Sequence, residues 1–85
     1  MKNVADTLAN RELIYGSYRR VAGISQMLKS VIANNTVSKR TPIQQESLDM
    51  ICNKLARIVA GDPNYADSWH DIAGYATLVV EELER

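Results

Sequence analysis

The sequence predicts an all-α protein, a small four-helix domain that spans residues 1–85. Apolar residues recur at steps of three and four, which is the spacing of a helix with one buried face. No segment alternates apolar and polar residues in the manner of a half-buried strand. Both prolines, and two of the four glycines, lie where helices are expected to begin or end.

The first two predicted helices differ in length. The first is short, from about Val4 to Arg11, and leads toward Tyr15-Gly16. Ser17 is a favourable N-cap for a longer helix from Tyr18 to about Ala33. The apolar residues of this second helix form one stripe at helical spacing: Val21, Ile24, Leu28, Val31 and Ile32.

The third predicted helix has the clearest start. Thr41 is suited to cap it, Pro42 fits the first helical position, and Gln44 completes a capping box. Gly61 is expected to end it. Its predicted buried face consists of Leu48, Ile51, Cys52, Leu55, Ile58 and Val59.

A sharp turn separates the third helix from the fourth. Asp62-Pro63 stops the third helix, and we expect Asn64 to cap the fourth, with Asp67 near its positive N-terminal end. The short connection predicts an antiparallel hairpin of two long helices. The residues of the fourth helix that we expect to pack inward are Tyr65, Trp69, Ile72, Ala73, Ala76, Val79, Val80 and Leu83.

Composition favours a small core completed by self-association. Only 6% of residues are aromatic and phenylalanine is absent, so the core must be largely aliphatic. Net charge is zero, but residues 1–40 carry five more basic than acidic residues and residues 41–85 the reverse. Unlike charges on the two halves suit contact between neighbouring subunits or a phosphate site, although two solvated helices of different charge are an alternative.

Two further features of the sequence concern its single cysteine and its cellular location. Cys52 is the only cysteine, so an intramolecular disulfide and a cysteine-based zinc cluster are excluded, and it is expected to pack as a small hydrophobe. No long apolar run or signal peptide is present in the sequence, so we expect no membrane partner and a cytoplasmic location.

The fourth helix has a second flank, opposite the inward stripe. It carries Gly74 and Leu78, and a leucine there has no reason to face water. Because glycine permits close approach of another backbone, we expect Gly74 and Leu78 to lie at an oligomer interface or against a ligand. A tolerated glycine and an exposed leucine are the alternative.

Cationic and aromatic residues near the hairpin suggest a phosphorylated ligand. Lys54 and Arg57 lie one turn apart on the third helix, and a guanidinium can hold two phosphate oxygens at once. A salt bridge from these residues to Asp67 or Asp71 across the hairpin is an equal alternative. Aromatic side chains with a neighbouring arginine could stack on a base and bind its phosphate. Tyr15 and Tyr18 lie near Arg19 in this way, although a turn whose tyrosines cover a small core is the alternative. Tyr75 on the fourth helix is a further candidate to contact a base.

Carboxylates on the last two helices raise the possibility of a metal site. Glu46 and Asp49 on the third helix, with Asp67 and Asp71 on the fourth, could line a magnesium site. Such a site would support hydrolysis of a nucleotide phosphate bond. No glycine-rich phosphate loop, nucleophile elbow or zinc spacing is present in the sequence. A basic recognition helix is also absent, so DNA binding is not expected.

Residues 10–83 resemble a family of short, uncharacterised proteins encoded by tailed phages and prophages. The similarity lies in Tyr15-Gly16, Lys54 to Ile58, Gly61 to Pro63 and, most specifically, Asp67 to Ala76. It implies a phage-derived protein that acts in the bacterial cytoplasm. More distantly, the hairpin is similar to the all-α nucleotide pyrophosphohydrolases of the MazG type, whose acidic pairs hold magnesium. Here the first acidic pair is incomplete.

Three functional hypotheses follow. The leading one is a homo-oligomer that binds a phosphorylated nucleotide-like ligand without a cofactor. Such a protein could act by sequestering a nucleotide signal. Its expected ligand-binding residues are Tyr15, Arg19, Lys54, Arg57, Asp67, Asp71 and Tyr75. The alternatives are a magnesium-dependent nucleoside triphosphate pyrophosphohydrolase and a protein-interaction module without a small ligand.

Overall fold

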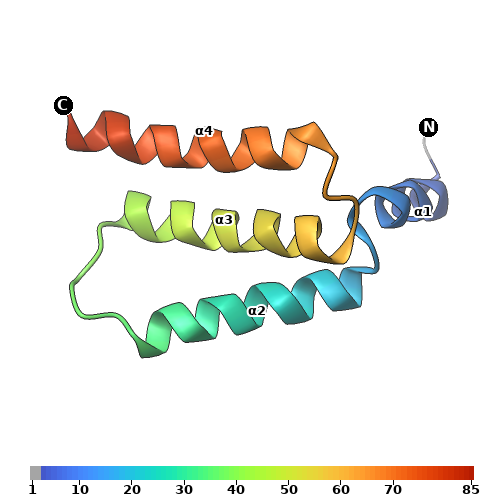
Figure 1. The fold of residues 1–85 in the computed structure, drawn as a ribbon, viewed down its shortest axis with the longest axis horizontal. Helices are drawn as coiled ribbons and strands as arrows, with labels where there is room; N and C mark the ends of the chain where they lie inside the picture. The colour runs from blue at the N-terminus through green and yellow to red at the C-terminus, as the bar shows by residue number, and fades with distance from the viewer. Residues whose placement is uncertain (1–2) are drawn as a thin grey trace.

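The computed structural model describes residues 3–85 and confirms the all-α fold (Figure 1). Four helices follow one another along the chain, and no strand is present in the described residues. The helices are α1 (Val4–Tyr15), α2 (Tyr18–Asn34), α3 (Pro42–Ala60) and α4 (Ala66–Leu83).

Most helix ends lie where the local sequence predicts them. The Ser17 side chain accepts a hydrogen bond from the backbone N–H of Arg20 at 3.2 Å. Thr41 and Gln44 form the expected capping box at the start of α3. Helix α1 continues past the predicted end at Arg11 to Tyr15, because no helix-breaking residue intervenes before Gly16.

The predicted N-cap of α4 is wrong. Tyr65, not Asn64, occupies the N-cap position, and its side chain makes no capping bond. Asn64 lies within the turn instead, where its backbone N–H donates to the Asp62 carboxylate at 2.9 Å. The Asp62 carbonyl also accepts from the backbone N–H of Tyr65 at 3.3 Å, so the turn runs one residue further than Asn64.

The three long helices form a single layer. Helix α3 lies between α2 and α4, which have no contact with each other, and α3 and α4 make the predicted antiparallel hairpin (Figure 1). Helix α1 lies at the end of the layer, where it contacts α2 and α3. The radius of gyration is 14.6 Å, whereas a compact chain of this length has about 12 Å.

This arrangement leaves a small core. Among the described residues, the buried hydrophobic side chains are Val21, Cys52, Ala56 and Ile58. The prediction that the whole α4 stripe packs inward is wrong, since the Trp69 side chain is 53% exposed. A helix at the edge of one layer touches a single neighbour, so it buries only a narrow line of its apolar residues.

Two tight turns hold α1 against the hairpin. Gly16 has a φ of 81°, a conformation that favours glycine, and it lies against the backbone of Ala60. Gly61 packs against the backbone of Ile14 and Tyr15, where a side chain would collide. The backbone N–H of Asp62 donates to the Ile14 carbonyl at 2.8 Å. The turn that follows α1 is therefore fixed to the turn that follows α3.

Candidate functional site

The contact between the two turns brings aromatic and cationic side chains together. The Cζ atom of Arg57 lies 4.5 Å from the centre of the Tyr15 ring. On the same ring, Tyr65 makes an edge-to-face contact with a centroid distance of 5.8 Å. The Tyr65 hydroxyl donates to an Asp67 carboxylate oxygen at 3.2 Å. Tyr15 therefore holds the Arg57 guanidinium in place through a cation–π contact.

A cavity of about 290 Å³ lies beside this cluster, bounded by α1, α2 and α3. Its size is near the lower end of the range for small-molecule sites. Two arginines and two tyrosines contribute to its wall, together with one acidic and one amide side chain. Its lining consists of Leu8, Arg11, Glu12, Tyr15, Gly16, Tyr18, Val21, Asn53 and Arg57.

The cations of this cavity have no ionic partner. Within residues 3–85, neither Arg11 nor Arg57 makes an ion pair with a carboxylate, and Glu12 makes none with either of them. The Tyr18 ring is 83% exposed and stands at the rim of the cavity. An anion that entered would meet two available guanidinium groups and an open aromatic face, which is a favourable setting for a phosphorylated aromatic ligand.

Lys54 lies elsewhere, in the salt bridge that was the alternative to ligand binding. Its Nζ is 2.9 Å from a carboxylate oxygen of Asp71 on α4. The ammonium group of Lys54, through a hydrogen bond and its charge, lowers the pKa of Asp71. These two side chains satisfy each other across the hairpin.

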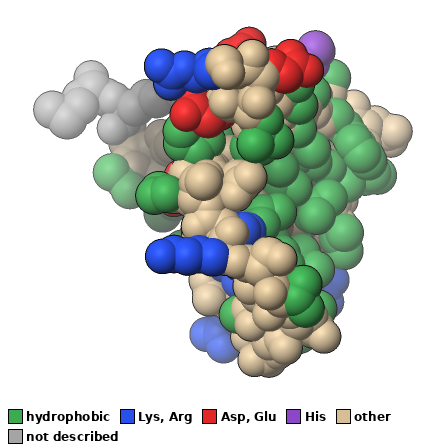
Figure 2. Space-filling view, turned by 90° about the vertical axis from the view of Figure 1, so that its left-hand side faces the viewer, with side chains coloured by type: hydrophobic (Ala, Val, Ile, Leu, Met, Phe, Trp, Pro, Cys, Tyr) green, Lys and Arg blue, Asp and Glu red, His purple; other side chains and the backbone are tan. Residues whose placement is uncertain are grey.

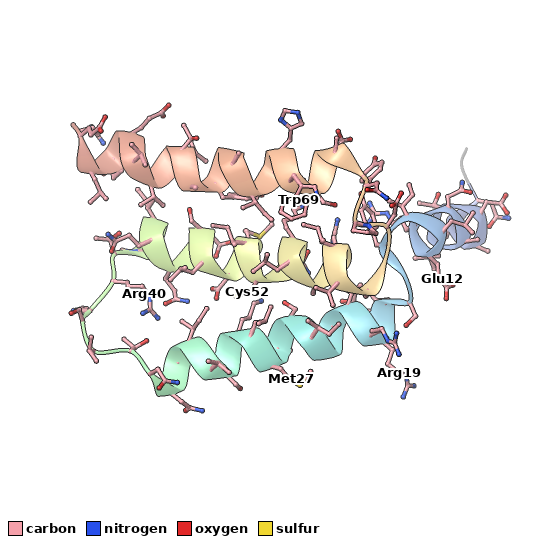
Figure 3. The ribbon with its side chains drawn as sticks, in the orientation of Figure 1. Glu12, Arg19, Met27, Arg40, Cys52 and Trp69 are labelled. Atoms are coloured by element: carbon pink, nitrogen blue, oxygen red, sulfur yellow. The ribbon has the colours of Figure 1, made fainter. Side chains whose placement is uncertain are left out.

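The other expected ligand residues are dispersed. Asp67 accepts the Tyr65 hydrogen bond described above. Tyr75 and Asp71 line an open hollow on α4 together with Leu78. Arg19 is exposed at the start of α2 and extends away from the helical layer (Figure 3). Of the seven residues predicted, Tyr15 and Arg57 alone line the cavity.

The structure does not bring the four predicted metal ligands together. No group of three or more histidine, cysteine or acidic side chains in residues 3–85 is placed to hold a metal ion. Glu46 is exposed, and Asp49 accepts a hydrogen bond from Gln45 at 3.0 Å. Asp67 and Asp71 are bound to Tyr65 and Lys54 respectively. Glu46, Asp49, Asp67 and Asp71 therefore do not form one group in the described residues of the single chain, and the magnesium site stays a prediction.

The flank that carries Gly74 and Leu78 is open in the single chain. Leu78 is 54% exposed, and nothing within 4 Å would meet a side chain added at Gly74. Both residues line the same hollow as Tyr75, with a volume of about 400 Å³. An interface at Gly74 and Leu78 stays a prediction.

Four polar residues of the cavity wall are not among the ligand-binding residues predicted from the sequence: Arg11, Glu12, Tyr18 and Asn53. The predicted first helix ends at Arg11, so Glu12 and Tyr15 are not expected on the same helical face as Leu8 and Arg11. The spacing of Leu8, Arg11 or Glu12, and Tyr15 at steps of three and four was the available signal. Tyr18 was considered for stacking but not for this cavity, and Asn53 carried no signal of its own.

Comparison with known proteins gives a family and no activity. Residues 2–83 match the model of a family described as "Domain of unknown function (DUF6378)". No curated protein and no solved structure matches the chain. Among the described residues, no helix combines the length and the apolarity that a membrane crossing requires.

Proposed function

The chain belongs to the DUF6378 family of unknown function, and from its own cavity we propose that it binds a phosphorylated nucleotide-like ligand without turnover. One observation carries the proposal. Two arginines that form no ion pair within residues 3–85 and two tyrosines surround one cavity of about 290 Å³. Guanidinium groups bind phosphate oxygens in pairs, and aromatic rings stack on bases.

The contacts divide the work among these residues. Arg57 is held by Tyr15, so its guanidinium meets the phosphate with little loss of conformational freedom. The Tyr15 ring already contacts Arg57 and Tyr65, so its faces are less free for a base. Tyr18 at the rim has an open ring and takes the stacking role. Arg11 adds a second cation on α1.

The resemblance to short phage proteins gives this binding a biological setting. A small phage-encoded binder in the host cytoplasm would sequester a nucleotide signal of the bacterial cell. Removal of a signal requires affinity and no catalytic group. The dispersed carboxylates are consistent with that role, and they do not favour the pyrophosphohydrolase alternative.

Thermal unfolding in the presence of a nucleotide panel tests the proposal. The panel contains mononucleotides, nucleoside triphosphates and cyclic dinucleotides, with a chelator present to remove divalent cations. At least one nucleotide is expected to raise the melting temperature of the protein, because a ligand that binds only the folded state stabilises it. Arg11→Gln and Arg57→Gln are each expected to weaken that nucleotide roughly 10- to 100-fold, the effect of losing one charged hydrogen bond.

Matched controls separate this site from general charge effects. Arg19→Gln removes an exposed arginine of α2 that does not line the cavity, and it should leave the affinity unchanged. Tyr18→Ala should weaken the nucleotide but not inorganic pyrophosphate, which has no base to stack. If no nucleotide stabilises the protein, or if the Arg11 and Arg57 variants bind as tightly as the wild type, the proposal fails. Release of pyrophosphate from a nucleoside triphosphate with magnesium would establish the enzyme alternative.

A further inference from the structure

A broad apolar surface covers one side of the helical layer, away from the proposed ligand cavity. Figure 2 looks along the helices from one end of the layer, and hydrophobic side chains gather along its right-hand flank. We call this surface the open face and define it by its large exposed hydrophobic residues. They are Val31 on α2, Leu55 and Val59 on α3, and Trp69, Val80 and Leu83 on α4.

Helix geometry explains why these residues share one side. Leu55 lies about 60° around α3 from Cys52 on one flank and from Ile58 on the other, and both of those residues are buried. Leu55 therefore projects between the two buried flanks. On α4, Trp69 and Val80 lie on the flank opposite Leu78, about 160–180° around the helix.

Two hollows connect the three helices on that side. One, of about 530 Å³, is lined by Leu48 and Ile51 of α3 and by Ala76 and Val79 of α4. A second includes Val31 of α2 and shares part of its wall, in the loop before α3, with the first. The apolar stripes of α2, α3 and α4 therefore open in the same direction.

The exposed area is too large for a compact monomer. The chain exposes 6481 Å², whereas a folded monomer of 9.5 kDa exposes roughly 5050 Å². The excess of about 1400 Å² exceeds the ~800 Å² that each partner buries in a standard interface. For two copies the excess is about 2800 Å² in total, within the range of obligate homodimers, which bury about 2000–5000 Å² in total.

A single layer of helices normally packs against a second layer, because helices bury their apolar stripes face to face. A second copy of this chain supplies such a layer, with an equal apolar area. A two-fold axis parallel to α3 would place α2 of each copy over α4 of the other, with the apolar flanks of both helices between them.

We infer that the open face is the interface of a homodimer in which the layers of two copies stack into a two-layer helical bundle. The interface is isologous, so the same residues of both copies meet. The ligand cavity has none of the six defining residues of the open face in its wall. This inference therefore stands independently of the proposed nucleotide site.

The chain offers a matched pair of variants for the test. Val80 and Leu78 lie on the same helix with similar exposure, 49% and 54%, but on opposite flanks. Sedimentation equilibrium of the full chain is expected to give twice the monomer mass at micromolar concentration. Val80→Lys should weaken the dimer at least about 100-fold, because it places an unpaired charge in an apolar contact. Leu78→Lys should leave the mass unchanged.

Trp69 gives a second readout that needs no substitution. It is the only tryptophan, it belongs to the open face, and it would be covered in the dimer. Its emission should shift to longer wavelength when the wild-type protein is diluted through the dissociation range. Circular dichroism shows whether Val80→Lys remains helical, and the dilution experiment decides the matter if it does not.

Two results would overturn the inference. One is a wild-type chain that stays monomeric, with solvent-exposed Trp69 emission, at all concentrations that sedimentation can follow. The other is a dimer that Leu78→Lys dissociates and Val80→Lys does not, which would place the contact on the Gly74 and Leu78 flank instead.

Discussion

At the residue scale, neighbours on other helices decide what each charged side chain can do. Lys54 and Arg57 lie one turn apart on α3 and look equivalent in the sequence. Lys54 meets the Asp71 carboxylate at 2.9 Å, whereas Arg57 meets the face of Tyr15. Because a ring does not neutralise a cation, Arg57 retains its capacity for an anion and Lys54 does not.

The hydrogen bond from the Tyr65 hydroxyl to Asp67 predicts how the ionisation of Tyr65 and the stability from this bond depend on pH. It raises the pKa of the Tyr65 hydroxyl, because the proton that the bond requires is lost on ionisation and the Asp67 charge opposes a second negative charge. The stability from this bond is complete below the ordinary tyrosine pKa of about 10 and is lost as the pH rises through the higher value of the folded state. Absorbance of tyrosinate in a pH titration measures this ionisation.

Asp67→Asn is the matched variant, since the amide oxygen still accepts the bond but carries no charge. It is expected to bring the Tyr65 transition down toward the ordinary value, and Tyr65→Phe identifies which transition belongs to Tyr65. An unchanged transition in Asp67→Asn would contradict the role given to the Asp67 charge.

At the element scale, the contact between the turn after α1 and the turn after α3 fixes the position of α1, more than the surface of α1 does. Helix α1 has no buried residue of its own among those described, so its position depends on the contact of Gly16 and Gly61 with the facing backbones. The same contact places Tyr15 against Arg57. The candidate site is therefore a consequence of turn-to-turn packing.

Gly61→Ala tests that dependence. A methyl group at this position would collide with the backbone of Ile14 and Tyr15, so one turn must move. We expect a loss of about 1–3 kcal/mol in the free energy of unfolding, measured by urea denaturation.

Gly23→Ala is the control for this change. Gly23 lies within α2 with nothing within 4 Å of an added methyl group, so alanine there should stabilise the protein by about 1 kcal/mol. Equal stability of Gly61→Ala and the wild type would show that the turns are not in close contact.

At the scale of the whole molecule, the chain is a layer with too little interior. No side chain larger than isoleucine is buried among the described residues, while Trp69 and several aliphatic residues are exposed. Folding of one copy alone leaves the open face in water. We therefore expect the stability of the protein to depend on its concentration.

The melting temperature gives the corresponding prediction. For a dimer that unfolds to two separate chains, it should rise by roughly 4 °C for each tenfold increase in concentration, given the enthalpy typical of two chains of this length. Calorimetry over two decades of concentration measures the slope. Val80→Lys should abolish the slope and Leu78→Lys should keep it, whereas a wild-type melting temperature independent of concentration would argue against a folded dimer.

Local chemistry allowed the sequence alone to determine the helices of this protein. Ser17, Thr41 and Gln44 cap helices through bonds to residues three positions away, so their effect is visible without the fold. The same reasoning failed at Asn64, where the choice between a cap and a turn depended on the path of the following backbone.

Only the tertiary structure decided which of these side chains meet. A helical period shows which residues share a face, but not whether another helix covers that face, so Trp69 and Val80 were expected inside and lie exposed. Likewise, the pairing of Lys54 with Asp71 and the grouping of Arg11, Tyr18 and Arg57 around one cavity arise from contacts between distant segments. The short connection predicts that α3 and α4 lie side by side. The spacing along the chain does not fix which of their side chains meet, nor where α1 and α2 pack, because these depend on contacts between whole helices.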